Sequence, residues 1–283
     1  MAGIFSGLEK LGLGNIGKGK LFEEPKKKEV VKKEEPKRKL QLVNEEDYLF
    51  DKKYTCPVCE DDFETKTVRT GKVRMKNVDI DLRPDYDELD QNKYDVIACP
   101  HCGYAALSRY FPTLNKYQIE DIRVQISMNY RKMEYDEPTY SYEYARSLYQ
   151  LALANAVVKK AKNSEKAYLC LKTAWVIRGE TQRLDPADED YEDRKAANDE
   201  QERELLANAL DGFAMARQTE EFPIAGMDTS TLDYLMAALA VETERYDLAS
   251  RLISELLVSK VANSRIKDKA RFLKEMMAEQ RSE

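Results

Sequence analysis

Four cysteines form two matching short motifs in this 283-residue sequence. Cys56 and Cys59 enclose a Pro-Val pair, and Cys99 and Cys102 enclose a Pro-His pair. A spacing of two residues lets both thiolates of a motif point at one ion, so the two motifs together supply four soft ligands for a tetrahedral metal. The sequence therefore predicts a metal site at Cys56, Cys59, Cys99 and Cys102, with structural zinc (Zn²⁺) as the favoured ion.

The same cysteines leave alternatives to zinc. Four thiolates also hold a single iron ion, as in rubredoxin-like sites, and iron is the minor alternative. Two unrelated pairs, or a redox disulfide, would need a thioredoxin-like strand and helix that the sequence does not show. The 39 residues between the motifs exceed the roughly 15 to 20 of a compact zinc motif, so strands must bring the pairs together. Four protein ligands leave no position for a catalytic water.

Few other residues are candidates for chemistry. His101 is the only histidine, and because it lies inside a complete ligand set we expect it to face solvent. Cys170 falls in an apolar helical pattern and is expected in the core. A single histidine argues against Ser-His-Asp, His-Glu-x-x-His and Cys-His sites, and the sequence contains no phosphate-binding loop. We therefore expect that the protein is not an enzyme.

A charged loop runs from Asp79 to Asp87. Asp81 and Arg83 either present a fixed surface to a partner or hold the loop in place, with Arg83 paired to a carboxylate and Pro84 setting the turn. The structural role is favoured. An unfamiliar enzyme using Asp81, Arg83 and tyrosines is the least supported alternative.

Strands between residues 51 and 110 are expected to position the cysteines. Apolar and β-branched residues predict strands at Thr65–Val68 and Val73–Ile80, with Thr70-Gly71 as the turn between them. A third strand is predicted through Tyr94–Ile97 into the second motif.

The chain from Leu114 onward is predicted to be helical, because apolar residues recur every three or four positions. Six helices are expected, around residues 148–156, 167–175, 205–213, 232–239, 248–256 and 266–277. Ser164 and Asp247 are expected to cap helix starts. Trp175 and the tyrosines between residues 130 and 149 are expected to pack where strands and helices meet.

Two helical pairs resemble tetratricopeptide repeats, with small residues where paired helices approach closely. Ala237, Tyr246 and Ala249 mark one pair. In the other pair, Ala167 occupies the position equivalent to Ala249. Ala167 and Ala249 are 82 residues apart, more than two repeats of about 34. The acidic stretch beginning at Leu184 is the expected insertion.

The composition divides the chain into three parts. Residues 1–45 combine a Gly-rich start with a Lys/Glu-rich run and are predicted to be a disordered tail, or alternatively a short apolar helix face for a partner or membrane surface. Residues 46–112 are the predicted zinc-ribbon-like module, and residues 113–283 the irregular tetratricopeptide-like helical domain. The predicted fold class is α+β, mostly α.

Charge is unevenly distributed along the chain, whose net charge is −6. Residues 20–40 carry nine Lys or Arg against five Glu, so the remainder sums to about −10. This acidic remainder disfavours a large contact with duplex nucleic acid. No stretch approaches the roughly 20 apolar residues of a membrane span. The N-terminus has neither a myristoylation glycine nor a secretory pattern, and a cytoplasmic location is expected.

The order of motifs resembles a bacterial family. The segments CPVC, VRTGKVR, DLRPDY and YDVIACPHCGYAAL, followed by helical repeats, are similar to the family called domain of unknown function 2225 over about residues 45–283. The resemblance implies a bacterial cytosolic protein with a zinc-ribbon-like start and tetratricopeptide-like helices, and it implies no particular activity.

Two functional hypotheses follow. The first is a non-enzymatic protein-protein interaction adaptor whose helical repeats take up a peptide or helix of an unidentified protein partner. The alternative is a nucleic-acid-associated regulator that contacts phosphate through basic residues alternating on one strand face, namely Lys66, Arg69, Lys72, Arg74 and Lys76. The sequence does not indicate the pathway or the oligomeric state.

Overall fold

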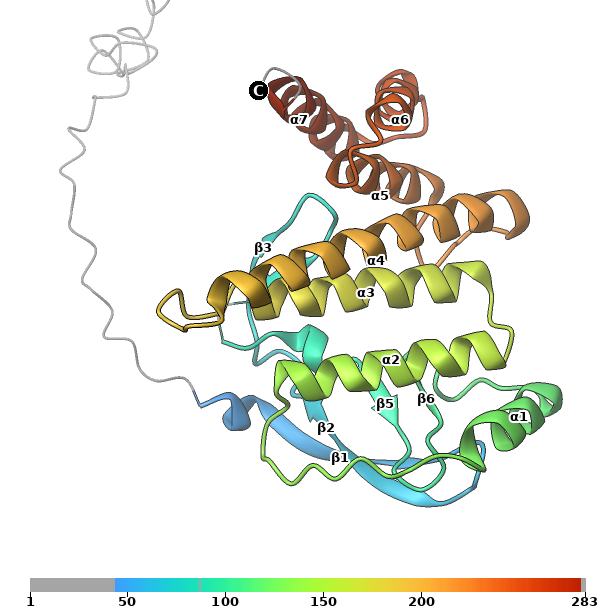
Figure 1. Cartoon of the computed structure of the whole chain (residues 1–283). Helices are drawn as coiled ribbons and strands as arrows, with labels where there is room; N and C mark the ends of the chain where they lie inside the picture. Colours follow the sequence, from blue (N-terminus) through green and yellow to red (C-terminus); the bar gives the residue numbers. More distant parts are fainter. Residues whose placement is uncertain (1–43, 87, 281–283) are drawn as a thin grey trace, which may run out of the picture. The chain divides into compact units, whose positions relative to one another are not determined.

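The structure, a computed structural model, describes residues 44–86 and 88–280 of the chain. These residues belong to one compact unit in which small sheets come first and helices follow (Figure 1). Of the predicted tail, only Asn44 and Glu45 fall within the described residues. The architecture confirms the predicted α+β, mostly α fold class.

The described strands form three separate two-stranded antiparallel sheets. They are β1 (Leu49–Thr55) with β2 (Asp62–Val68), β3 (Met75–Val78) with β4 (Pro84–Tyr86), and β5 (Val96–Ala98) with β6 (Ala105–Leu107). Each sheet is a hairpin of strands adjacent in sequence. Short 3₁₀ turns at Glu45–Tyr48 and Gln91–Tyr94 precede β1 and β5.

The predicted turn at Thr70-Gly71 is present between two strands, β2 and β3, and Gly71 has the positive φ of 77° that glycine tolerates. The two strands do not form a hairpin with each other. The strands on either side belong to different sheets, because β2 pairs with β1 and β3 pairs with β4. The prediction omitted β1, whose central residues 51–53 are charged and exposed on both faces and therefore show no alternation.

Seven α-helices follow in the described residues. They are α1 (Lys116–Ile122), α2 (Tyr142–Val158), α3 (Asn163–Thr181), α4 (Tyr191–Thr219), α5 (Thr229–Glu242), α6 (Tyr246–Val258) and α7 (Ser264–Gln280). A π-helical turn at Arg123–Ser127 extends α1. The six predicted helices correspond to α2 through α7. The prediction omitted α1, a helix of seven residues that buries only Ile122.

Two helix starts differ from the predicted caps. Lys162 and Arg245 occupy the cap positions of α3 and α6 without making a side-chain cap hydrogen bond, and Ser164 and Asp247 lie within the first turns. The backbone N–H of Ser164 instead donates to the carboxylate of Glu220 at 2.9 Å. A carboxylate distant in sequence thus replaces a local cap, which a local motif cannot indicate.

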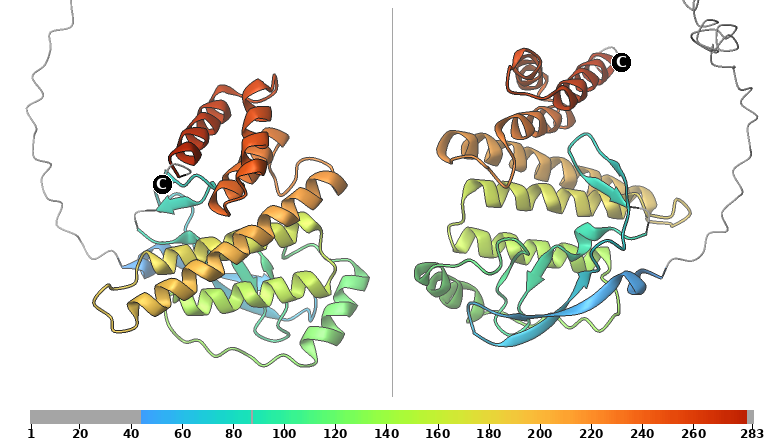
Figure 2. Two further views of the ribbon diagram at one scale, coloured as in Figure 1. Left: turned by 45° about the horizontal axis from the view of Figure 1, so that its top comes forward. Right: turned by 180° about the vertical axis from the view of Figure 1, so that it is seen from behind.

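Helices α2, α3 and α4 lie side by side with alternating direction, and α5, α6 and α7 continue beyond α4 (Figures 1 and 2). The β5–β6 hairpin packs on α2. The acidic stretch beginning at Leu184 is the turn before α4 and the first part of that helix. α4 packs along α3, so this stretch extends a helical pair.

Three clusters of buried apolar side chains hold these elements together. One fills the space among α3 to α7 and includes Trp175; the second joins β5 and β6 to α2 and includes Tyr140 and Tyr149. The third surrounds the cysteine motifs. The predicted packing of Trp175 and of these tyrosines is confirmed. No helix in the described part of the chain is both long and apolar enough to cross a membrane.

Candidate metal centre

The four predicted cysteine ligands lie together at the tips of two hairpins. Cys56 and Cys59 lie in the turn between β1 and β2, and Cys99 and Cys102 lie in the turn between β5 and β6. The four sulfur atoms are within 4.8 Å of one another, and the Cys56–Cys102 and Cys59–Cys99 sulfur pairs are each 3.6 Å apart. Sulfurs at the corners of a tetrahedron with metal–sulfur bonds of about 2.3 Å are about 3.8 Å apart. The cluster can hold a metal ion.

The two turns hold their cysteines with the same backbone pattern. The N–H of Cys56 or Cys99 donates to the carbonyl five residues later, and its carbonyl accepts from the N–H four residues later, at 2.8 to 3.0 Å. The residues after the second cysteine, Glu60 and Gly103, have φ of 67° and 74°. In the first turn, the N–H of Val58 also points at the Cys56 sulfur at 3.4 Å. Such N–H groups stabilise thiolate ligands.

The clustered thiols differ in the direction in which their pKa is shifted. Hydrogen bonds from Cys102 and Cys99 lower the pKa of Cys56 to about 4, and the same contact with Cys56 raises the pKa of Cys102 far above its ordinary value. Burial raises the pKa of Cys59. One thiolate is therefore favoured by the protein alone, whereas a bound cation would favour all four.

Residues from other elements support each turn. The carbonyl of Gly103 accepts a hydrogen bond from the side-chain amide of Asn155 in α2 at 3.0 Å, and the ring of Tyr130 lies directly against Gly103. The carbonyl of Val58 accepts two hydrogen bonds from the guanidinium of Arg123, at 3.0 and 2.6 Å. The donor set, its burial and these supports fit a four-thiolate structural metal.

His101 and Cys170, the two other residues considered for chemistry, lie where the sequence predicted. His101 is exposed. Cys170 is buried in α3, and burial raises the pKa of its thiol to about 11. A thiol with this pKa is a poor nucleophile at neutral pH.

The charged loop is fixed by buried ion pairs. Arg83 is buried, and its guanidinium lies 3.3 Å from the carboxylate of Asp79 and 3.6 Å from that of Asp90. Asp81 is fully buried and accepts a hydrogen bond from the indole N–H of Trp175 at 2.8 Å. The predicted pairing of Arg83 with a carboxylate is confirmed. The last position of the predicted loop, Asp87, lies outside the described residues.

Arg178 in α3 joins this loop to two further helices. Its guanidinium lies 3.1 Å from Asp81, 2.6 Å from Glu202 in α4 and 2.9 Å from Glu242 in α5. Burial, with the nearby charge of Asp81, raises the pKa of Glu242 to about 8. The raised pKa favours the protonated form of Glu242, and a protonated Glu242 would reduce repulsion among the three carboxylates.

The five basic residues proposed for phosphate binding do not share a strand face. Lys66 lies in β2 and Lys76 in β3, in different sheets, and the other three lie in the connection between these strands. The predicted alternation along one strand is therefore wrong, because the chain turns at Gly71.

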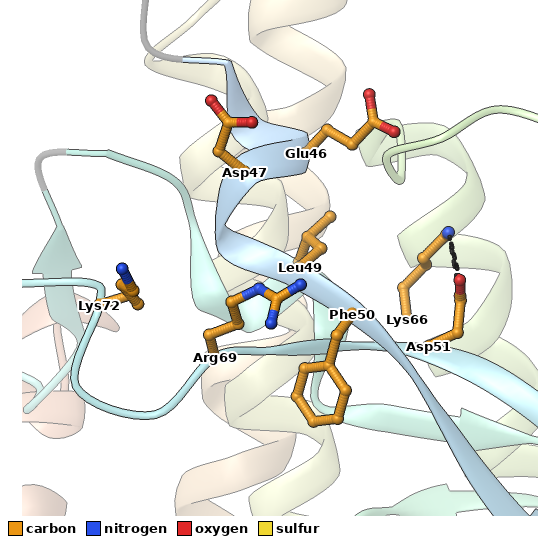
Figure 3. A pocket seen from close by; sticks show the side chains of 8 residues that line it. All are labelled: Glu46, Asp47, Leu49, Phe50, Asp51, Lys66, Arg69 and Lys72. Atoms are coloured by element: carbon orange, nitrogen blue, oxygen red, sulfur yellow. Dashed lines mark hydrogen bonds and ion pairs between the residues drawn. The ribbon is translucent and has the colours of Figure 1, made fainter.

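Lys66, Arg69 and Lys72 nevertheless border one open cavity of about 730 Å³ (Figure 3). Acidic side chains border it as well, namely Glu46, Asp47 and Asp51. The Lys66 ammonium lies 2.9 Å from Asp51, and the Arg69 guanidinium lies over the ring of Phe50 at 5.6 Å. The cavity thus carries balanced charge.

A second cavity of about 550 Å³ is a groove over α3, between α2 and α4. Its apolar residues come from all three helices and include Leu153, Val157, Cys170, Leu205 and Met215. Val157 and Met215 are 61% and 56% exposed. The sequence predicts a surface of this kind but not its residues, because exposed apolar residues look like core residues in a periodic pattern.

Comparison with known proteins identifies a family for the chain but no individual relative. No curated protein and no solved structure matches the chain. The model of one protein family matches residues 49–277, which include all four clustered cysteines, the charged loop and α1 to α6. The chain therefore belongs to the family described as "Uncharacterized protein conserved in bacteria", domain of unknown function 2225.

Proposed function

We propose that the protein is a non-enzymatic adaptor of the bacterial cytoplasm. In this proposal, structural zinc holds the two cysteine turns together, and the groove over α3 binds a helix of another protein. The groove is the observation that carries the proposal, because it combines an apolar floor with exposed apolar side chains at its rims. Helix-in-groove binding uses this arrangement.

The groove has the length of a short helix. Its α3 residues run from Asn163 to Thr173, which corresponds to about 15 Å at 1.5 Å per residue. Three turns of a partner helix cover this length. Their apolar face would contact Leu153 and Leu205 on opposite walls, where α2 and α4 border the groove.

Polar residues at the groove edges favour an amphipathic partner over a wholly apolar one. Lys166 and Glu204 border the groove with opposite charges, and Gln150, Gln201 and Asn208 add amide groups. Amides both donate and accept hydrogen bonds. They suit the polar flanks of a helix whose apolar face enters the groove.

Stacked helical pairs support the proposed tetratricopeptide-like character of the domain. Ala237 and Ala249 are fully buried, as residues between closely approaching helices should be, and Ala167 is nearly so. Gly212 of α4 lies close to Ala167, and a side-chain carbon at residue 212 would come within 2.9 Å of it. Small residues thus permit close contact between α3 and α4.

Charge substitutions in the groove test the adaptor function. Val157→Glu and Met215→Glu are expected to abolish capture of a partner from bacterial lysate while leaving thermal unfolding unchanged, because both side chains are exposed. Phe272→Glu is the matched control, since Phe272 is 56% exposed on α7 and does not border the groove. Capture that is nuclease-resistant but equal for all three variants would contradict a role for the groove.

Metal analysis tests the proposed ion. The expected result is one zinc per chain, in colourless protein, lost when any of the four cysteines is replaced by serine. Stoichiometric iron with visible colour would support the iron alternative. The cytoplasm keeps thiols reduced, which suits four thiolate ligands.

The nucleic-acid alternative rests on the three basic side chains that share the cavity in Figure 3. Its acidic border opposes phosphate binding. If this function were correct, nucleic acid would copurify, the affinity would fall steeply with salt, and Arg69→Ala would weaken binding. Binding insensitive to salt and to this substitution would exclude it.

A further inference from the structure

Strand β1 has one edge without a pairing strand among the described residues. Arg69 N–H donates to the carbonyl of Tyr48, and Cys56 N–H donates to the carbonyl of Asp61. Antiparallel ladders alternate between hydrogen-bonded and non-hydrogen-bonded pairs. The even-numbered residues of β1 therefore bond to β2, and the odd-numbered residues Asp51, Lys53 and Thr55 direct their N–H and C=O groups away from it.

The unpaired edge is accessible to another chain. β1 makes its main contacts with β2 and with the 3₁₀ turn before it. The Asp51 and Lys53 side chains are 50% and 66% exposed, and Lys52 between them is also exposed. By contrast, the outer edge of β2 is partly covered, because the N–H of Lys66 donates to the hydroxyl of Tyr140 at 3.4 Å.

We propose that β1 pairs antiparallel with β1 of a second copy of this chain, with the twofold axis at Lys52. The two hairpins then form one four-stranded sheet. Asp51 of each copy lies opposite Lys53 of the other, in hydrogen-bonded pairs, and Leu49 lies opposite Thr55. Such an interface is self-complementary and closes as a dimer.

Charge complementarity selects this partner and this register. Asp51 is paired with Lys66 across β1 and β2, and Lys53 is opposite Glu64. In the dimer, the two symmetry-related rows through Asp51 and Lys53 alternate in sign, from Lys66 to Asp51 and then to Lys53 and Glu64 of the second copy. Opposite charges on neighbouring strands stabilise a sheet, and like charges destabilise it.

The neighbouring twofold registers do not pair opposite charges in this way. An axis at Asp51 places two aspartates opposite each other, and an axis at Lys53 places two lysines opposite each other. The proposed register brings the two Lys52 side chains together on the other face, where each ammonium lies 4.9 Å from the ring centroid of its own Tyr54. On that face Phe50 meets Tyr54 of the second copy, and the aromatic contacts offset the single repulsive pair.

Complementary charge variants of the full chain test the dimer. Asp51→Lys alone and Lys53→Asp alone each place like charges at both equivalent contacts, so each is expected to raise the dimer dissociation constant roughly 30-fold. Mixing the two variants restores opposite charges at both contacts. Native mass spectrometry of variants with different tags should therefore detect a heterodimer and few homodimers, and the Asp51→Lys/Lys53→Asp double variant should dimerise.

The double variant separates this effect from folding, because it loses both intrachain ion pairs, Asp51–Lys66 and Lys53–Asp62, of which each single variant loses one, but regains the contacts between copies. Lys53→Pro gives an independent test: it removes an N–H that faces away from β2, which an edge strand tolerates. It should abolish dimerisation, whereas Lys53→Ala should weaken it less. Monomeric wild-type protein at high concentration, or single-variant homodimers as stable as the wild-type dimer, would overturn the proposal.

Discussion

The two cysteine turns share one backbone conformation and have different surroundings. The turn at Cys56–Cys59 ends in exposed residues, Glu60 and Asp61, and is supported by an exposed arginine, Arg123. The turn at Cys99–Cys102 ends in buried residues, Gly103 and Tyr104, and is supported by buried Asn155. The Cys-Pro-x-Cys motif thus specifies a local geometry, while the surrounding packing determines how much each residue contributes to stability.

Removal of the proposed metal should have the largest effect on stability, and the two turns should respond to it differently. A chelator, or replacement of a cysteine by serine, should lower the free energy of unfolding by several kcal/mol, because structural metal binding contributes directly to folding. Hydrogen exchange should accelerate more at Cys56–Asp61 than at Cys99–Tyr104, since the second turn keeps its packing. Equal acceleration in both turns would show that the metal, rather than packing, orders the second turn.

Among single changes in and around the two turns, Gly103→Ala should be the most damaging after loss of a ligand. A side-chain carbon at this residue would lie 2.5 Å from the ring of Tyr130, and φ is 74°. The expected cost is about 2 to 4 kcal/mol of unfolding free energy, from overpacking and backbone strain. Glu60→Ala is the matched control and should be nearly neutral, because Glu60 already adopts φ of 67° with a side chain. Denaturant unfolding of both variants checks this difference.

Asn155→Ala should have an intermediate effect. It removes the donor to the buried carbonyl of Gly103 and costs about 1 to 3 kcal/mol. Arg123→Ala removes the equivalent support from Val58, and it should cost about 1 kcal/mol or less because water can replace the lost hydrogen bonds at this exposed side chain. Equal decreases in melting temperature for the two variants would contradict the difference in packing between the two turns.

Glu60→Gly should give the smallest change and the opposite sign. Glycine adopts positive φ without the steric cost that a side chain adds, so this change should stabilise the protein by up to about 1 kcal/mol. Since Glu60 is exposed, few contacts are lost. A lower melting temperature would indicate that the Glu60 side chain contributes a contact that outweighs its strain.

The motifs and periodic patterns predicted the parts of the molecule that depend on local chemistry. The spacing within each cysteine pair predicted the cluster, and the apolar period predicted α2 to α7. Pairing between strands was not predictable in this way, because β1 carries charges on both faces and gave no alternation. The start of α3 depends on Glu220, which is distant in sequence and cannot be recognised from a local motif.

In the candidate sites too, local motifs predicted the central residues but not the residues that support them from distant parts of the sequence. Arg83 could be assigned a carboxylate partner from the sequence, but its position against α3 follows from contacts with residues such as Gln182, whose side-chain oxygen lies 3.1 Å away. Likewise, Asn155 follows the helical apolar period, and only the fold reveals that it supports Gly103. Supporting residues of this kind have no spacing rule that identifies them.

The contacts of Gly103 also affect the order of events during synthesis. All four cysteines leave the ribosome before Tyr130 and Asn155, since both supporting residues lie later in the chain. The emerging chain therefore presents its complete set of thiols before the second turn can be covered. Metal bound at this stage would protect those thiols from oxidation, and a truncated chain ending before Tyr130 would keep the ligands while leaving the second turn without either supporting residue.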